Sequence, residues 1–283
     1  MNIREFYEYS KKNLPDLDDH TLQSEVNIIL ENYLNLSYTD LFLNRNKEIS
    51  YENLEVLKEA VYKRSQGIPL QYILGHWSFM GMDLLVGEGV LIPREDTMAV
   101  IDLAMNCKNF REKSNIIDIC SGSGCISLSI EKFLKNNSNI YALEYSSDAF
   151  CYLKKNIKKE NSSVKPIFGD LYEKYKDFEN NFFDLILSNP PYIKTNEIET
   201  LEKEISFEPR VALDGGLDGL HFYRGICKLW TPKLKIGGSL VFEIGKDQFE
   251  DVKKIMENSG YSSIEFKKDI NGIIRAIIGT KNV

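Results

Sequence analysis

From about residue 115 onward, short apolar runs alternate with longer segments in which polar and apolar residues mix. The apolar runs have the length of buried strands, and most of the intervening segments have the length of a helix. This alternation is typical of a three-layer α/β domain, in which helices cover both faces of a mainly parallel sheet. We expect strands at 116–120, 140–143, 164–168, 183–187, 239–244, 263–266 and 273–278.

The first part of the chain has a different pattern, with apolar residues at helical spacing. Leu22, Val26 and Ile29 would share one face of a helix, and Ser50 can cap a further helix. Over residues 79–86, apolar and polar residues partly alternate, which predicts a β-hairpin around Gly81. We therefore expect a small helical domain over 1–75, a β-hairpin linker over 76–96 and an α/β domain over 97–283.

Composition excludes several classes of protein. The 283 residues contain 35 Lys and Arg against 42 Asp and Glu, a net charge of −7, whereas a protein that holds duplex nucleic acid would normally carry a basic surplus. The five cysteines include no CxxC pair, and no run of 18 apolar residues could span a membrane. The N-terminal residues also lack the apolar stretch of a signal peptide. We expect a cytoplasmic, monomeric protein with reduced thiols, no metal and no membrane contact.

A glycine-rich turn joins the first predicted strand of the α/β domain to a helix. A dinucleotide fingerprint would need glycine at the position of Ser127, and a phosphate loop would need Gly-Lys where Gly124-Cys125 stands. An acidic residue, Asp118, instead precedes the short loop. This arrangement suits a positively charged cofactor such as S-adenosylmethionine, although an ordinary tight turn between strand and helix would also explain it.

Acidic residues also follow the next two predicted strands. Glu144 lies 20 residues after Gly124, where a carboxylate can accept both hydroxyls of a ribose; capping of the helix near Ser147 is the alternative. Asp170 could accept a hydrogen bond from an adenine amino group, with Leu171 packed on the ring. Acids at three successive strand ends favour a cofactor site over chance.

The tetrapeptide Asn189-Pro190-Pro191-Tyr192 follows the fourth predicted strand. The prolines restrict the backbone so that the Asn189 side chain and the Pro190 carbonyl, both acceptors, can point at one spot. A planar –NH2 group has two donors for such a pair, and Tyr192 offers a flat face for stacking. An Asn-Pro turn with a packed tyrosine would need no chemistry, but the position beside the candidate cofactor site favours catalysis.

Asn-Pro-Pro-Tyr after a DxxxGxG strand resembles the signature of class I methyltransferases that act on planar nitrogens. Three further stretches are similar to one branch, the N5-glutamine methyltransferases of peptide chain release factors. They are PLQYILG at 69–75, LIPREDT at 91–97, and FEPRVAL at 207–213 with the GGLDGL that follows it. Two departures stand out. Glu95-Asp96 replaces the family's Pro-Glu, and Cys120 replaces the first loop glycine, which leaves open any role that needs a positive φ there.

The resemblance implies a Rossmann-like class I methyltransferase sheet with helices on both faces, and substrate docking by residues 1–75. It implies S-adenosylmethionine as cofactor and S-adenosylhomocysteine as product. The cofactor would be bound by the loop and the strand-end residues, namely Asp118, Cys120, Ser121, Gly122, Ser123, Gly124, Glu144, Asp170, Leu171 and Asn189. The acceptor would be bound by Asn189, Pro190, Pro191 and Tyr192, with Asn189, Pro190 and Tyr192 catalytic.

The function implied is methyl transfer to the side-chain amide nitrogen of the glutamine in the Gly-Gly-Gln motif of class I release factors, which are the expected partners. A ribosomal-protein glutamine methyltransferase would have the same active-site chemistry and stays an alternative. A nucleic-acid adenine or guanine methyltransferase is a second one, although it predicts a basic face or a target-recognition domain that the sequence does not suggest. Stable binding of nucleic acid is not expected.

Overall fold

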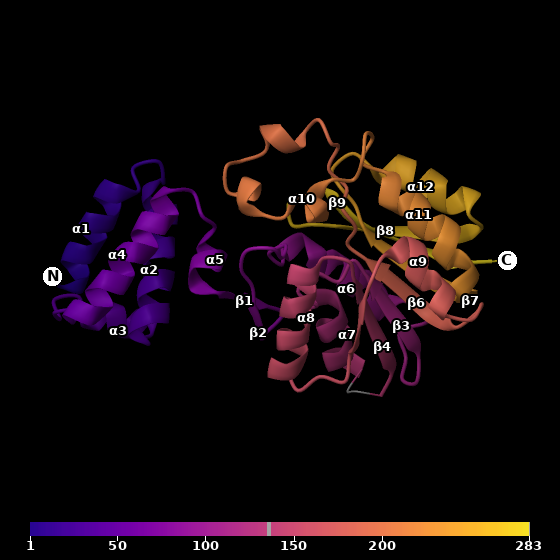
Figure 1. Cartoon of the computed structure of the whole chain (residues 1–283), viewed down its shortest axis with the longest axis horizontal. Helices are drawn as coiled ribbons and strands as arrows, with labels where there is room; N and C mark the ends of the chain where they lie inside the picture. The colour runs from indigo at the N-terminus through magenta and orange to yellow at the C-terminus, as the bar shows by residue number, and fades with distance from the viewer. Residues whose placement is uncertain (135–136, 283) are drawn as a thin grey trace. The chain divides into compact units, whose positions relative to one another are not determined.

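The computed structural model describes residues 1–134 and 137–282 and divides into two compact units. One unit contains Met1–His76 together with Lys203–Phe207, and the other contains Trp77–Glu202 and Glu208–Val283. Figure 1 shows the helices of the first unit in indigo and purple and the sheet of the second in magenta to yellow. No helix in the described part of the chain is long and apolar enough to cross a membrane.

The first unit is helical, as its apolar spacing predicts. Its helices are α1 (Ile3–Asn13), α2 (Asp19–Leu34), α3 (Tyr38–Leu43), α4 (Tyr51–Ser65) and α5 (Leu70–Leu74). Polar side chains cap the first four, including the predicted cap Ser50, and the buried faces form one apolar core around Phe6, Val26 and Leu57. The buried Arg64 guanidinium donates to Glu25 and to Glu204, which ties the short 203–207 segment to α4.

The second unit is built on a seven-stranded sheet, and every strand predicted from the sequence is present. The strands are β3 (Asn115–Ile119), β4 (Asn139–Glu144), β5 (Lys165–Phe168), β6 (Phe183–Ser188), β7 (Leu234–Glu243), β8 (Tyr261–Lys268) and β9 (Ile274–Lys281). Their order is β5-β4-β3-β6-β7-β9-β8, parallel from β5 to β7 and antiparallel at β9 and β8. This confirms the predicted mainly parallel sheet.

Alternate residues of the central strands enter two separate cores. Ile116 packs with α6 (Met98–Asn106), α7 (Cys125–Leu134) and α8 (Ser147–Lys159), and the next residue, Ile117, packs with α9 (Leu171–Lys174), α11 (His221–Trp230) and α12 (Phe249–Asn258). Figure 1 shows these two helical layers on opposite faces of the sheet. Both faces are therefore buried, which explains why the strands read as continuous apolar runs.

The predicted hairpin is formed by β1 (His76–Phe79) and β2 (Met82–Leu85), with Met80 and Gly81 at positive φ in the turn. From Trp77 onward it belongs to the sheet unit. Asn156 on α8 accepts from the Leu85 N–H at 2.7 Å and donates to the Leu85 carbonyl at 3.0 Å, as a neighbouring strand would. That 1–75, 76–96 and 97–283 work as separate functional parts stays a prediction.

Candidate active site

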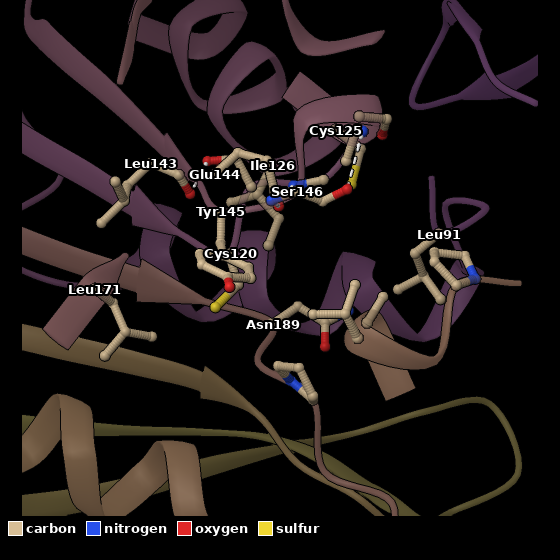
Figure 2. A pocket seen from close by; sticks show the side chains of 18 of the residues that line it. Leu91, Cys120, Cys125, Ile126, Leu143, Glu144, Tyr145, Ser146, Leu171 and Asn189 are labelled. Atoms are coloured by element: carbon tan, nitrogen blue, oxygen red, sulfur yellow. Dashed lines mark hydrogen bonds between the residues drawn. The ribbon is translucent and has the colours of Figure 1, made fainter. Parts of the chain in front are cut away.

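A cavity of about 280 Å³ lies in the sheet unit at the carboxyl ends of β3, β4, β5 and β6. Ligand sites of open parallel sheets form at this edge, where the loops leave the strands. The walls are mostly apolar, with a few polar groups. In the view of Figure 2, Cys120 lies between Glu144 and Asn189, and Leu91 lies to the right of all three.

The glycine loop after β3 has the backbone that its residues require. Cys120, Gly122 and Gly124 all have positive φ, at 63°, 55° and 87°. A Cβ on Gly124 would lie 2.7 Å from the Leu153 side chain, whereas a Cβ on Gly122 would meet nothing within 4 Å. Gly124 is thus needed for close packing on α8, and Gly122 leaves its backbone open to the cavity. Position 120, where the motif that the sequence resembles has glycine, has positive φ, and here a cysteine adopts it.

Asp118 is fully buried at the end of β3 and does not line the cavity. Its Oδ2 accepts from the Ser127 N–H of α7 at 3.1 Å, and its Oδ1 has no hydrogen-bond partner among the described residues. Burial raises the pKa of Asp118 to about 7, and the Glu144 charge acts in the same direction. An unpaired buried acceptor of this kind is stabilised by a nearby positive charge.

Glu144 and Asp170 both line the cavity and organise the loops around it. The Glu144 carboxylate accepts from the Gly122 N–H at 2.8 Å and from the Ser146 N–H at 2.7 Å, and burial raises its pKa. Asp170 caps α9 by accepting from the Tyr172 N–H at 2.9 Å. Each carboxylate therefore stabilises a loop through backbone hydrogen bonds and keeps lone pairs for a ligand.

These residues fit S-adenosylmethionine on two observations. Glu144 on the cavity wall and the unpartnered Asp118 Oδ1 behind it are buried acceptors whose ionised forms a bound cation would stabilise, and the cofactor carries an ammonium and a sulfonium. The apolar wall includes Leu143 and Leu171, which suit a flat heterocycle. Arg94, which is paired with the buried Glu208, also lines the cavity. Within the described chain, no group of three or more His, Cys, Asp or Glu could hold a metal.

Arg94 is placed by a residue far away in the sequence. Its guanidinium donates to the buried carboxylate of Glu208, which also accepts from the Ile92 N–H at 3.0 Å. Two stretches that the sequence flagged, 91–97 and 207–213, therefore meet at the cavity. No role for either residue follows from the sequence alone, because the signal is a contact between positions 114 residues apart.

Asn189 directly follows β6 (Phe183–Ser188) and lines the cavity. Its Nδ2 donates to Thr97 Oγ1 at 3.3 Å, and Thr97 Oγ1 donates to Oε2 of Glu243 at 2.6 Å. The Tyr192 hydroxyl donates to the other oxygen of Glu243 at 3.3 Å. Burial raises the pKa of Glu243 to about 7. Thr97 lies in the LIPREDT stretch but was not predicted as a site residue, and no sequence motif marks Glu243.

The backbone around Tyr192 is tightly enclosed. Gln248 donates to the Tyr192 carbonyl at 2.9 Å, and a Cβ on Gly215 or on Gly219 would clash with the Tyr192 backbone at 2.7 Å and 2.4 Å. A Cβ on Gly245 would lie 3.0 Å from the tyrosine ring. Gly215 and Gly219 of the GGLDGL stretch are therefore required by their packing against the Asn-Pro-Pro-Tyr segment.

The structure brings most of the predicted site residues to one cavity. The residues that line it are Cys120, Ser121, Gly122, Ser123, Glu144, Asp170, Leu171, Asn189 and Pro191. Four predicted residues do not line it, namely Asp118, Gly124, Pro190 and Tyr192. Asp118 lies in β3, Gly124 in the glycine loop, and Pro190 and Tyr192 in the Asn-Pro-Pro-Tyr segment. None of the three histidines, His20, His76 and His221, lines the cavity in the described chain.

The chain is similar in fold to solved methyltransferases. A methyltransferase from Pyrococcus furiosus gives a TM-score of 0.54 at 19% identity, covering 73% of this chain and 92% of that one. The hMettl16 catalytic domain, solved in complex with the MAT2A 3'UTR hairpin 6, gives 0.58 at 16%, covering 78% and 82%. At these identities the likeness establishes the fold, and it confirms the predicted class I methyltransferase architecture.

Sequence relatives are more specific. Residues 6–75 match the PrmC N-terminal domain and residues 101–213 the Methyltransferase small domain. Relatives named release factor glutamine methyltransferase include one from Clostridium acetobutylicum, 35% identical over 95% of this chain and 94% of its own length. Those from Fusobacterium nucleatum and Geobacter sulfurreducens are 38% and 34% identical, each over 98% of this chain and over 77% and 96% of their own lengths. The chain therefore belongs to the release factor glutamine methyltransferase family, as its motifs predict.

Proposed function

We propose that this enzyme transfers a methyl group from S-adenosylmethionine to the side-chain amide nitrogen of the glutamine in the Gly-Gly-Gln motif of class I release factors. The observation that carries the proposal is the position of Asn189. Its carboxamide lies on the wall of the same cavity as the glycine loop, Glu144 and Asp170. A planar amide acceptor at Asn189 would therefore face a cofactor held by the strand ends.

Cofactor binding is assigned to the cavity wall. Glu144 would accept the ribose hydroxyls, Asp170 the adenine amino group, and Leu171 would pack on the ring. The Gly122 backbone is open to the ligand, and Asp118 acts from behind the loop through its charge and its contact with Ser127. When bound, the cofactor supplies an electrophilic methyl group on a sulfonium.

The residues at the acceptor site would act by orienting the glutamine amide nitrogen. A primary amide is a poor nucleophile, because the nitrogen lone pair is delocalised into the carbonyl. The Asn189 side-chain oxygen and the Pro190 carbonyl would accept its two N–H groups, raise the electron density on nitrogen and aim it at the methyl group. The proton would leave after transfer, when the nitrogen is strongly acidic. No histidine on the cavity wall of the described chain is available as a general base.

The same proposal includes the binding partner and the cellular location of the enzyme. The helical unit, residues 1–75, would dock the release factor, while the sheet unit performs the chemistry. We propose a monomeric enzyme that acts in the cytoplasm, where its five unpaired cysteines would stay reduced.

Mass spectrometry of a class I release factor, after incubation with the enzyme and isotope-labelled S-adenosylmethionine, tests the proposal. The expected result is one labelled methyl group on the glutamine of the Gly-Gly-Gln motif. A release factor with alanine at that position is the matched control and should stay unlabelled. Label on ribosomal protein or RNA in a parallel incubation, with none on the release factor, would overturn the assignment.

A further inference from the structure

Three segments that are distant in the sequence meet behind Asn189. Thr97 ends the short 3-10 helix η1 (Glu95–Thr97), Tyr192 follows the two prolines, and Glu243 ends β7. Thr97 and Glu243 are each only 1% exposed. The chain of contacts runs from Asn189 Nδ2 to Thr97 Oγ1 at 3.3 Å and on to Glu243 Oε2 at 2.6 Å.

When Glu243 is ionised, the donors and acceptors in this series of hydrogen bonds can be assigned in only one way. A carboxylate has no proton to donate, so the Thr97 hydroxyl must give its single hydrogen to Glu243. The Thr97 oxygen then has only lone pairs for Asn189, and these require the –NH2 end of the carboxamide. The Asn189 oxygen is consequently turned away from Thr97.

This matters because an asparagine carboxamide is nearly symmetric in shape. Turned by 180°, it would occupy the same space but exchange its acceptor oxygen for two donor hydrogens. A donor facing the –NH2 group of the acceptor glutamine would repel it and could not orient the nitrogen. The enzyme therefore needs a means of selecting one of the two orientations.

We propose that Glu243, acting through Thr97, is a positioning residue that selects the orientation of Asn189 in which the carboxamide oxygen is presented to the methyl acceptor. The inference rests on the proposed function of Asn189. The second oxygen of Glu243 accepts from the Tyr192 hydroxyl, so one carboxylate anchors both ends of the Asn-Pro-Pro-Tyr segment.

Several groups set the protonation state of Glu243. Burial raises its pKa to about 7 and the negative charge of Asp96 acts in the same direction, while the hydrogen bonds from Thr97 and Tyr192 and the positive charge of Arg275 favour the ionised form. The assignment of donors given above therefore applies at pH values above about 7. Arg275 is itself shared between Asp96 and Asp269, with its Nε 3.1 Å from each carboxylate. If the hydrogen bond between Thr97 on η1 and Glu243 on β7 served folding alone, the threonine oxygen would not need to face Asn189.

The first test needs no substrate. In isotope-labelled enzyme, the side-chain amide resonances of Asn189 are assigned by their loss in Asn189→Asp. Thr97→Val removes the hydroxyl with little change of shape, and should move at least one of these proton resonances upfield, whereas Thr97→Ser should restore it. Thr231→Val, which removes another threonine hydroxyl at the end of α11, is the matched control and should leave them unchanged. Unshifted Asn189 resonances in Thr97→Val would overturn the relay.

The second test is kinetic. Single-turnover methylation of a release factor by Thr97→Val should be slower than wild type by about tenfold to a hundredfold, with an unchanged half-saturating concentration of release factor, and Thr97→Ser should stay within about threefold. In an Asn189→Ala background, Thr97→Val should cost less than about threefold, because nothing is left to orient. Equal losses in both backgrounds would show a structural role and overturn the proposal. If wild-type enzyme methylates no release factor, the proposed function fails, while the resonance test still decides on the relay.

Discussion

The Glu144 carboxylate, at the end of β4, accepts a hydrogen bond from the Gly122 N–H, in the loop after the neighbouring strand β3, at 2.8 Å. Glu144, which would accept the ribose hydroxyls, thus also stabilises the glycine loop that faces the cofactor. Glu144→Ala should weaken S-adenosylmethionine binding by about 1–3 kcal/mol, because it removes an acceptor and frees the loop. Calorimetric titration measures this. Unchanged affinity would remove Glu144 from the cofactor site.

Cys120 offers a test of backbone strain. A residue with a Cβ at φ 63° is less stable than glycine there, so Cys120→Gly should unfold with a free energy about 1 kcal/mol higher than Cys120→Ala. Both variants lose the thiol, and they differ only in the Cβ, so the comparison isolates the conformational term. Urea unfolding gives the values. An alanine variant as stable as the glycine variant would show that position 120 is not strained.

Docking by the helical unit predicts that its exposed apolar side chains bind the release factor. Phe42, on α3, is 64% exposed. Phe42→Ser should raise the KM for the release factor and leave the affinity for S-adenosylmethionine unchanged. Ile270, 94% exposed between β8 and β9, is the matched control, and Ile270→Ser should alter neither value. Equal effects of the two variants on KM would contradict a docking surface on α3.

The buried Glu243 makes stability depend on pH. Burial raises its pKa from 4.5 to about 7, so the folded protein keeps this proton to a higher pH than the unfolded chain does. Its contribution to stability is therefore complete below about pH 4.5 and is lost as the pH rises to about 7. Glu243→Gln cannot titrate there. The free energy of unfolding of Glu243→Gln relative to wild type should rise by about 1 kcal/mol per pH unit across this window. Denaturant unfolding at several pH values measures it, and a flat difference would exclude the raised pKa.

The sheet was predictable because its strands are buried on both faces and appear as uninterrupted apolar runs. The start of β7 was not. The sequence predicts a strand from residue 239, whereas β7 begins at Leu234. Gly237, at positive φ, and Gly238 look like a break, but the strand passes through them with a shift of register against β6 between Phe183 and Leu185.

The cavity wall was predictable where motifs mark strand ends, as at Gly122, Glu144 and Asn189. The residues behind it were not. Glu243 ends an apolar run like any strand-end acid, and its partner Thr97 lies 146 residues earlier in the chain. Only the folded arrangement brings them together, so a pattern in one sequence does not reveal the pair.

The central claim is that Asn189 accelerates transfer by orienting the acceptor amide. Single-turnover methylation of a release factor by wild type, Asn189→Ala and Asn189→Asp, followed from about pH 6 to pH 9, tests it most directly. Asn189→Ala should lose about 10²–10³ in rate with little change in release-factor affinity, since a single oriented contact is lost. Asn189→Asp keeps an acceptor oxygen but adds negative charge near the sulfonium, and should also be slow. A fully active alanine variant, with a rate that follows the titration of a histidine, would contradict the account.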